Sequence, residues 1–344
     1  MKQLVIALLI GLAVFGIIPA CSSTPTPEEA RTKYHKYLAT QEPKPNPEEA
    51  DAYYNKGLEK YNQGDWNSAI TNYNKAIELN PNNFLAYNDR GSAYYKKGEF
   101  DRAMADYNKA IELNPNHTNA YNNRGSVYNK KGNLDLAIAD YTKAIELNLN
   151  DADAYYNRGL AYDKKGILDK AMIDWAKAIE LDPKNAEAYY NLGSAHEDKG
   201  NFGQAMDNYN KAIELNPNYA KPYNNLGNIF DNNGDIDLAM VHWSKAIELD
   251  PKYDAAYYNR GIAYYKKGSL DQAIADWTKA IEINPKHIMS YAGRTFAYDA
   301  KKDYKEAIAD AEMFIKLAPE HPKTPTMRRF IEDWKKMLAE QEKK

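Results

Sequence analysis

The side chains best suited to chemistry are few and widely spaced. No phosphate-binding loop, nucleophile elbow or second cysteine accompanies the single Cys21. Acidic residues are abundant but form no isolated pair that could act as acid and base. The histidine spacing fits no metal-binding motif, so we expect neither catalysis nor a metal, cofactor or small-molecule substrate. The histidines are His35, His117, His196, His242, His287 and His321.

Charge and composition narrow the classes of partner. The 344 residues include 45 Lys plus Arg and 48 Asp plus Glu, for a net charge of -3. A nucleic-acid-binding surface needs a basic excess that this balance lacks, so nucleic acid is not an expected partner. Tyr outnumbers Phe by 29 to 8 and strings such as KAIELNP recur, which indicates internal repetition rather than unrelated domains.

A tyrosine recurs every 34 residues. Setting it as position 4 of a repeat places the repeat starts at residues 50, 84, 118, 152, 186, 220, 254 and 288. Positions 8 and 15 are then glycine in seven copies, position 20 is always alanine, and position 24 is aromatic in seven copies. Position 32 is proline except at Leu149. The tyrosines are Tyr53, Tyr87, Tyr121, Tyr155, Tyr189, Tyr223, Tyr257 and Tyr291.

Each copy predicts two helices, because its apolar positions follow helical spacing twice. Glycine at position 15 accepts the left-handed conformation that ends the first helix, and proline at position 32 stops the second. We expect positions 4, 8 and 11 to face the partner helix, with glycine 8 opposite alanine 20 so that the helices approach closely. One helix pair cannot bury its apolar face, so the copies must stack.

This register resembles the tetratricopeptide repeat over residues 50–321. The resemblance implies an all-α, right-handed superhelical solenoid of eight 34-residue helix-turn-helix repeats. The eighth copy departs from the pattern, with Thr295, Lys302 and Ala311 at positions 8, 15 and 24. Within residues 322–344 an apolar stripe predicts a capping helix over 324–342 that closes the stack, with a partner-binding helix as the alternative. The stripe consists of Met327, Phe330, Ile331, Trp334, Met337 and Leu338.

Arginine at position 7 and aspartate at position 23 occur together. Repeats five and six have Leu192 and Leu226 at position 7, and there position 23 is Asn208 or His242. We infer an ion pair between the two helices of one repeat, with the Arg stem lying along apolar surface. Shared descent of recently duplicated copies would also keep the two residues together. The predicted pairs are Arg90–Asp106, Arg124–Asp140, Arg158–Asp174, Arg260–Asp276 and Arg294–Asp310.

Position 6 forms a row of amide and carboxylate side chains on the face opposite positions 4, 8 and 11. Asparagine is a mediocre helix residue, and its donors and acceptor suit the backbone of an extended guest chain. The row resembles the asparagine ladder in the concave groove of some long tetratricopeptide superhelices, which implies peptide binding. Duplication of an idle residue would explain it equally well. The row consists of Asn55, Asp89, Asn123, Asn157, Asn191, Asn225 and Asn259.

The N-terminus has the features of an export signal, with Lys2 followed by an apolar run to Ile18. The string from Ile18 to Cys21 resembles the bacterial lipobox, which implies a lipoprotein signal peptide over 1–20 and acylation, such as with palmitate, at Cys21. An uncleaved signal anchor is the alternative. Residues 21–49 are rich in proline and are expected to form a tether, with one short helix over 28–41.

We therefore expect a membrane-anchored scaffold in the bacterial cell envelope that binds an extended peptide or protein partner in its groove. In the lipoprotein pattern, Ser22 after the cysteine favours the outer membrane, with the repeats facing the periplasm or the surface. The adaptor role is what the family resemblance implies. A self-assembling structural lipoprotein and a glycan or peptidoglycan binder are the alternative functions.

Overall fold

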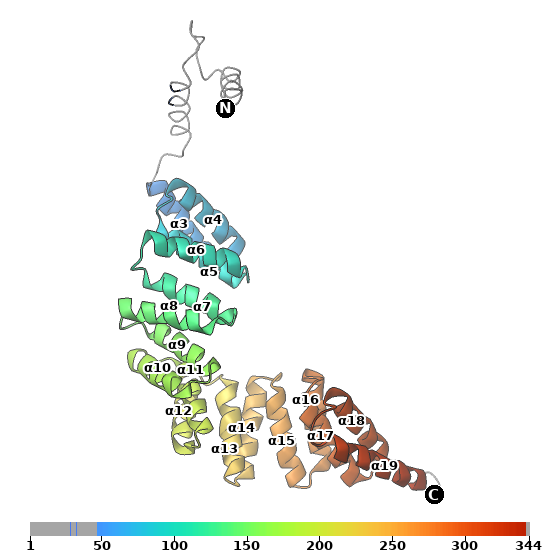
Figure 1. Ribbon diagram of the computed structural model, residues 1–344. Coiled ribbons are helices and arrows are strands. Elements are labelled where there is room, and N and C mark those ends of the chain that lie inside the picture. Colours follow the sequence, from blue (N-terminus) through green and yellow to red (C-terminus); the bar gives the residue numbers. More distant parts are fainter. Residues whose placement is uncertain (1–27, 29–31, 33–46, 342–344) are drawn as a thin grey trace. The chain divides into compact units, whose positions relative to one another are not determined.

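The computed structural model describes residues 28, 32 and 47–341 (Figure 1). The predicted signal peptide, Cys21 and most of the predicted tether and its short helix lie outside the described residues. The first helix of the first repeat begins at Pro47, three residues before the predicted repeat start at 50. Proline fits that place, because the first turn of a helix does not need its N–H group.

The described residues from 47 to 149 form a first compact unit of three helix pairs. The helices of each pair lie side by side, and each second helix also contacts the first helix of the next pair. The helices are α3 (Pro47–Asn62), α4 (Trp66–Leu79), α5 (Phe84–Lys96), α6 (Phe100–Leu113), α7 (Thr118–Lys130) and α8 (Leu134–Leu147).

Residues 150–341 belong to a second unit with five helix pairs and one further helix, arranged by the same contacts. The first three pairs are α9 (Ala152–Lys164), α10 (Leu168–Leu181), α11 (Ala186–Asp198), α12 (Phe202–Leu215), α13 (Ala220–Asn232) and α14 (Ile236–Leu249). The rest are α15 (Asp254–Lys266), α16 (Leu270–Ile283), α17 (Ile288–Lys301), α18 (Tyr304–Leu317) and α19 (Thr324–Gln341). The predicted all-α class with paired helices is confirmed.

The helix ends show which residues set the repeat boundaries. Every glycine at position 15 has a φ between 74° and 86°, as predicted for the left-handed cap, and in the eighth repeat Lys302 adopts φ 63° instead. The second helices end two residues before the proline, as α6 does at Leu113. Helix α8 ends at Leu147 although its copy has Leu149 in place of proline. The proline therefore follows the helix end without being required for it.

The core differs from the expected stripe of positions 4, 8 and 11. The fully buried positions of the first helix are 3, 8 and 10, as Ala86, Gly91 and Ala93 illustrate, whereas Tyr87 and Tyr94 at positions 4 and 11 are half-buried. Positions 20 and 27 of the second helix are alanines with 0% exposure in the first seven repeats. The small residues at these positions bring the helices close together, because packed interiors leave little room between neighbours.

Glycine at position 8 faces an aromatic ring, and the expectation that it faces alanine 20 is wrong. A Cβ on Gly125 would lie 2.8 Å from Tyr141 Cε1, and one on Gly159 would lie 2.6 Å from Trp175 Nε1. The aromatic ring at position 24 thus lies against the glycine of its own repeat. In the eighth repeat, where Ala311 leaves no ring, position 8 can carry the buried Thr295.

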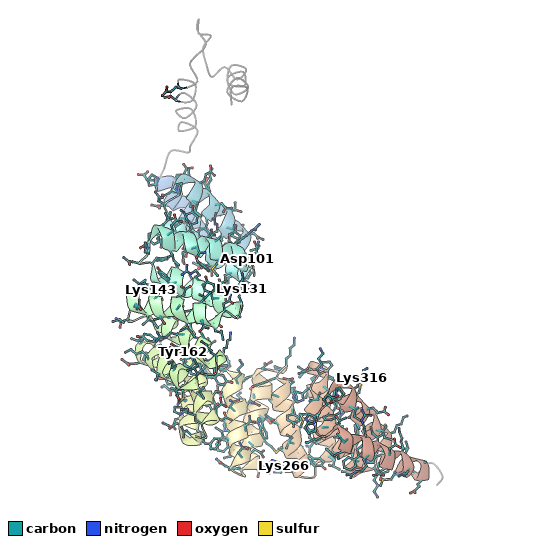
Figure 2. The ribbon with its side chains drawn as sticks, viewed as in Figure 1. Asp101, Lys131, Lys143, Tyr162, Lys266 and Lys316 are labelled. Carbon is teal, nitrogen blue, oxygen red and sulfur yellow. The ribbon has the colours of Figure 1, made fainter. Side chains whose placement is uncertain are left out.

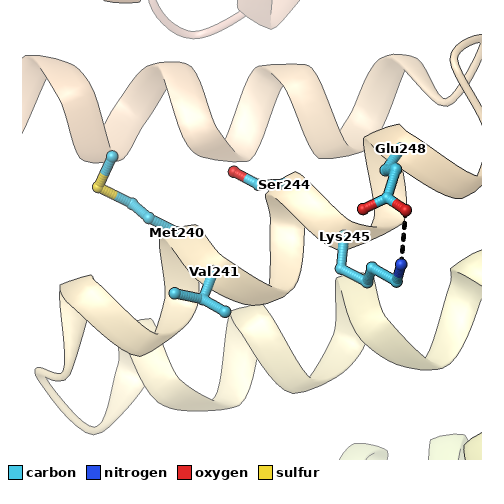
Figure 3. Close-up of a pocket in the computed structure, with 5 residues that line it drawn as sticks. All are labelled: Met240, Val241, Ser244, Lys245 and Glu248. Carbon is cyan, nitrogen blue, oxygen red and sulfur yellow. Dashed lines mark hydrogen bonds and ion pairs between the residues drawn. The ribbon is translucent and has the colours of Figure 1, made fainter.

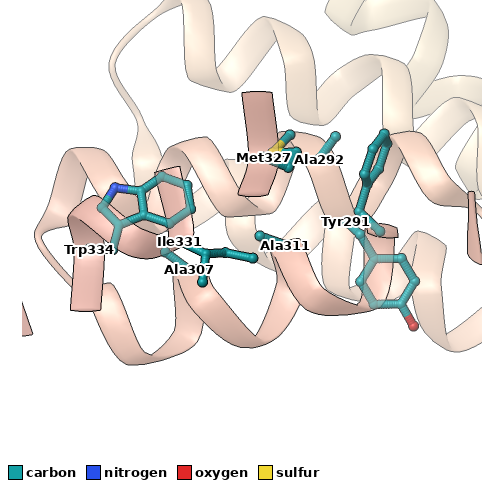
Figure 4. Close-up of a cluster of buried hydrophobic side chains, with 8 residues drawn as sticks. Tyr291, Ala292, Ala307, Ala311, Met327, Ile331 and Trp334 are labelled. Carbon is teal, nitrogen blue, oxygen red and sulfur yellow. The ribbon is translucent and has the colours of Figure 1, made fainter. Parts of the chain in front are cut away.

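Helix α19 covers the end of the second unit (Figure 4). Its Met327, Ile331 and Trp334 pack into one cluster with Ala311 and Phe314 of α18. Met337, on the same predicted stripe, is 43% exposed, so only part of the stripe is buried. None of the helices in the described part of the chain has the length and apolarity of a bilayer-crossing segment.

Candidate binding face

The position-6 residues lie on the first helices of the repeats, where their side chains line up with those at positions 5 and 9 of the preceding copy. Asn55 is exposed on α3, and the other six residues of the row are half-buried. We call positions 5, 6 and 9 of the first helices the polar row. It is present in both units, and within each unit hydrogen bonds from position 6 reach the preceding repeat.

The position-6 amide nitrogens donate to residues of the preceding repeat. Asn123 Nδ2 donates to Asn88 Oδ1 at 3.0 Å in the first unit. In the second unit, Asn191 Nδ2 donates to the Tyr156 hydroxyl at 3.1 Å. Asn259 Nδ2 donates to Asn224 Oδ1 at 3.2 Å and Asn228 Oδ1 at 2.9 Å. These amides were expected to leave all their groups to a guest, but the structure uses their N–H groups to join repeats.

The carbonyl oxygens of the same amides do not take part in the hydrogen bonds that join repeats. Within the described part of the chain, Oδ1 of Asn123, Asn191 and Asn259 accepts no hydrogen bond that would compete with a guest. An amide oxygen carries two lone pairs. The polar row therefore offers acceptor oxygens to a guest, whereas its position-6 N–H groups already bond to the preceding repeat.

Aromatic side chains at position 24 form hydrogen bonds with residues at positions 6, 9 and 12 of the first helices. The hydroxyl of Tyr107 donates to Ser92 Oγ at 3.3 Å, and Trp243 Nε1 donates to Asn228 Oδ1 at 3.1 Å. The Tyr209 hydroxyl donates to Glu197 Oε2 at 2.6 Å and accepts from Asn225 Nδ2 at 2.9 Å. Burial is the main cause that raises the pKa of Tyr209, so its hydroxyl stays protonated.

The structure brings together all five predicted Arg–Asp pairs in the same geometry. In the second repeat, Arg90 Nε donates to Asp106 Oδ2 at 2.8 Å and Nη2 donates to Oδ1 at 2.7 Å. The five carboxylates keep only 4–9% of their side-chain exposure. Burial raises the pKa of the Asp106 carboxyl and Arg90 opposes that shift. The other pairs are Arg124–Asp140, Arg158–Asp174, Arg260–Asp276 and Arg294–Asp310.

Sequence reasoning missed a third contact of the arginine. Arg90 Nη1 donates to Asn74 Oδ1 of the preceding repeat at 2.6 Å, and Arg294 Nη1 donates to Thr278 Oγ1 at 2.8 Å. The pair therefore joins consecutive copies as well as the two helices of one copy. The sequence signal for this contact was a polar residue at position 25 of the repeat that precedes each repeat with the arginine.

Lysine at position 14 also joins consecutive copies. Lys131 pairs with Asp101 of the preceding repeat (Figure 2), and Lys199 pairs with Asp169. Such exposed pairs contribute little at physiological salt, because water and ions screen them.

Two further features of the described residues are the histidines and a surface depression on α14. Burial lowers the pKa values of His117, His196 and His242, so these imidazoles are held neutral. The described residues contain no cluster of three His, Cys, Asp or Glu that could hold a metal ion. A shallow depression on α14 is lined by Met240, Val241, Ser244, Lys245 and Glu248, the last two forming an ion pair at 2.6 Å (Figure 3).

Family models match the chain continuously from residue 57 to residue 287. A model described as "TPR repeat" matches residues 57–98, 91–132, 125–166, 164–200 and 232–268. Two models described as "Tetratricopeptide repeat" match residues 186–219 and 255–287, and residues 208–240. A comparison with curated proteins returns no match.

Solved structures give the same picture of the fold. A chain of the APC/C hetero-tetramer Cut9–Hcn1 is 19% identical with a TM-score of 0.59, over 89% of this chain and 60% of its own. Pseudomonas aeruginosa pilF is 18% identical with a TM-score of 0.57, over 62% of this chain and 96% of its own. MamA is 34% identical over 48% of this chain and 96% of its own, with a TM-score of 0.43.

Proposed function

The chain belongs to the tetratricopeptide-repeat family, and from this premise we propose that it is an adaptor that binds an extended segment of another protein. The segment lies along the polar row. Repeats of this family serve as scaffolds for protein–protein interaction, and a row shared by successive copies suits a partner without regular structure of its own.

The acceptor oxygens of the polar row are the observation that supports this proposal most directly. An extended backbone presents an N–H group at every residue but proline, and these groups need acceptors when they leave water. Packed helices lie about 8–10 Å apart, and a polyproline II segment advances about 9 Å in each three-residue turn. One N–H group per turn can therefore meet one amide oxygen per repeat.

We further propose that the protein is held at a membrane through lipid on Cys21, with residues 22–46 as the tether. Each buried CH₂ of an acyl chain contributes about 0.8 kcal/mol, so several chains together hold a domain firmly. The setting is the bacterial cell envelope, at the outer membrane. Metabolic labelling with an alkyne fatty acid tests this part, since Cys21→Ser should abolish the label and an unchanged label would exclude acylation at Cys21.

Site-specific photo-cross-linking in intact cells tests the binding face. A photoreactive residue at the exposed Asn119 of α7 or Asn232 of α13 lies on the stripe of the polar row. The exposed Ala139 of α8 and Ala275 of α16 lie on second helices and serve as matched controls. We expect discrete protein adducts from the first two positions only. Adducts from the control positions alone, or adducts only with a second copy of this chain, would contradict the proposal and favour self-assembly.

A further inference from the structure

Asp89 is the only carboxylate among the seven position-6 residues of the row, the others being asparagine. It is half-buried on α5 and accepts hydrogen bonds from the Tyr54 hydroxyl at 2.7 Å and from Asn88 Nδ2 at 2.9 Å. Neither donor is charged, and within the described residues Asp89 takes part in no ion pair. His117 is the basic side chain that acts on this carboxylate, but burial lowers the His117 pKa, so the imidazole is a poor counter-charge. A partly desolvated charge without a counter-charge is unfavourable unless a partner supplies one.

Three tyrosines of the first repeat interact electrostatically with this carboxylate, and Tyr54 also contacts it. Tyr54 and Tyr61 belong to α3 and Tyr73 belongs to α4. The Tyr54 and Tyr73 ring centroids lie 6.0 Å apart with a 43° tilt. Burial and the charge of Asp89 raise the pKa values of all three hydroxyls, which places them in the field of the carboxylate.

The Tyr73 hydroxyl is a buried polar group near Tyr54, and Trp175 Nε1 at the same position of the fourth repeat is likewise buried without a partner among the described residues. Tyr73 is 0% exposed, and its oxygen has no hydrogen-bond partner among the described residues. The equivalent hydroxyls of Tyr107 and Tyr141 donate to a serine at position 9. In the first repeat position 9 is Leu58, so that partner is lost. A buried polar group of this kind calls for a bonding partner.

The chemistry of the site selects a cation. Each Asp89 oxygen keeps a lone pair after accepting one bond, and phenol oxygens accept as well. Aromatic faces attract ammonium and guanidinium groups. One carboxylate with phenols does not meet the ligand number that a structural metal needs. The exposed Lys96 cannot supply the counter-charge to Asp89, because it lies seven helical residues, or about 10 Å, farther along α5.

We propose that Asp89 and Tyr54, whose ring packs against that of Tyr73, form a binding site for a lysine or arginine side chain of the docked partner. The inference rests on the proposed function for the source of that side chain. The bound ammonium or guanidinium donates to Asp89 and lies beside the ring of Tyr54. This site between the first two repeats thereby fixes the register of an extended guest, which the uniform amides of the other repeats cannot do.

Saturation-transfer NMR on the full chain tests the site with small probes. The probes are the Nα-acetyl methylamides of lysine and arginine, with the norleucine compound as the uncharged counterpart. We expect transfer to the side-chain methylenes of the two cationic probes and none to norleucine. Asp89→Asn restores the residue of the other repeats and should weaken binding at least about tenfold, or about 1.4 kcal/mol. Tyr73→Phe keeps the ring that packs against Tyr54 and removes only a buried hydroxyl, so it should change binding little.

A matched charge control is Asp51→Asn, because Asp51 is an exposed carboxylate on α3 one turn from Tyr54. It should bind the probes as the wild type does. Equal binding of norleucine, or unchanged binding by Asp89→Asn, would overturn the proposal. Cross-links without probe binding would leave docking intact and remove this site. Probe binding in a chain that gives no protein adducts would keep the site and remove the docking function.

Discussion

At the scale of single residues, the Arg–Asp pair shows how a charge is kept inside a repeat. Each carboxylate accepts two guanidinium bonds and is nearly inaccessible to water, while Arg90 lies over the Tyr87 ring with 5.4 Å to its centroid. Bidentate geometry and the ring contact offset part of the desolvation cost. Repeats five and six have leucine at position 7, so they fill the same place without burying a charge.

Removing only one partner of an Arg–Asp pair should lower the free energy of unfolding more than removing both. Arg124→Leu leaves the Asp140 carboxylate buried without its counter-charge, which should cost about 3–5 kcal/mol of unfolding free energy. The double variant Arg124→Leu with Asp140→Asn copies the natural pair Leu192 and Asn208 and should cost much less. Urea unfolding of the four proteins checks this. Additive costs would show that the two residues are not coupled.

The pH dependence of stability should depend in part on His242. Its ring stacks on Phe230 at 5.1 Å, and burial lowers its pKa. The unfolded chain then binds the proton more tightly, so the folded state loses stability as the pH falls through the unfolded value of about 6.5. His242→Asn copies Asn208, whose amide donates to Gln204 O. Its unfolding midpoint should fall less between pH 8 and pH 5.5 than that of the wild type, and parallel shifts would contradict this.

Contacts between side chains could be predicted from the sequence only where two positions change together across the repeats. Arg124 and Asp140 were paired from their joint occurrence, and the structure places them in contact. The direction of the Asn123 amide was not predictable, because a row of asparagines is the same sequence whether its donors face a guest or the preceding repeat. The special place of Asp89 depends on Tyr54, which lies far from it in sequence.

At the scale of the helix pair, the spacing of two helices is set by a ring lying on a glycine. The sequence suggested that two small residues face each other, since both glycine 8 and alanine 20 are small. The structure instead places Tyr141 on Gly125, and Ala137 is buried elsewhere in the interface. Composition alone does not distinguish the two, because position 24 could equally have filled a flank.

Adding one methyl group at position 8 should therefore be harmful. Gly125→Ala places Cβ 2.8 Å from Tyr141 Cε1, and we expect a loss of about 1–3 kcal/mol in spite of the better helix propensity of alanine. Gly203→Ala in α12 is the control, because nothing lies within 4 Å of its Cβ. It should gain up to about 1 kcal/mol. Thermal unfolding compares them, and a stable Gly125→Ala would refute the ring contact.

At the scale of the whole molecule, a stack of copies has ends that must be closed. The eighth repeat has a different core, and Trp334 of α19 donates from Nε1 to Asp299 Oδ1 at 2.7 Å across its surface. In repeat proteins each copy is stabilised mainly by its neighbours, so an end without a cover lowers the stability of the last copies first.

Weakening the contact of α19 should therefore loosen the C-terminal repeats before the others. Ile331→Ala removes a side chain with 5% exposure and should cost about 2–5 kcal/mol locally. Met337→Ala, from the exposed part of the same stripe, should cost far less. Hydrogen exchange should rise first in α17 and α18 of the Ile331 variant. Equal exchange in the two variants would show that α19 does not act as a cap.

The arginine that touches two copies at once has a consequence for how such a chain changes in length. Asn74 and Asp106 each lie 16 residues from Arg90, on either side of it. If residues 84–117 were deleted from the gene, Asn74 would meet Arg124 with the same donor and acceptor atoms. Recombination between repetitive coding segments can thus add or drop whole copies without requiring a new interface, whereas a deletion out of step with 34 residues would destroy one.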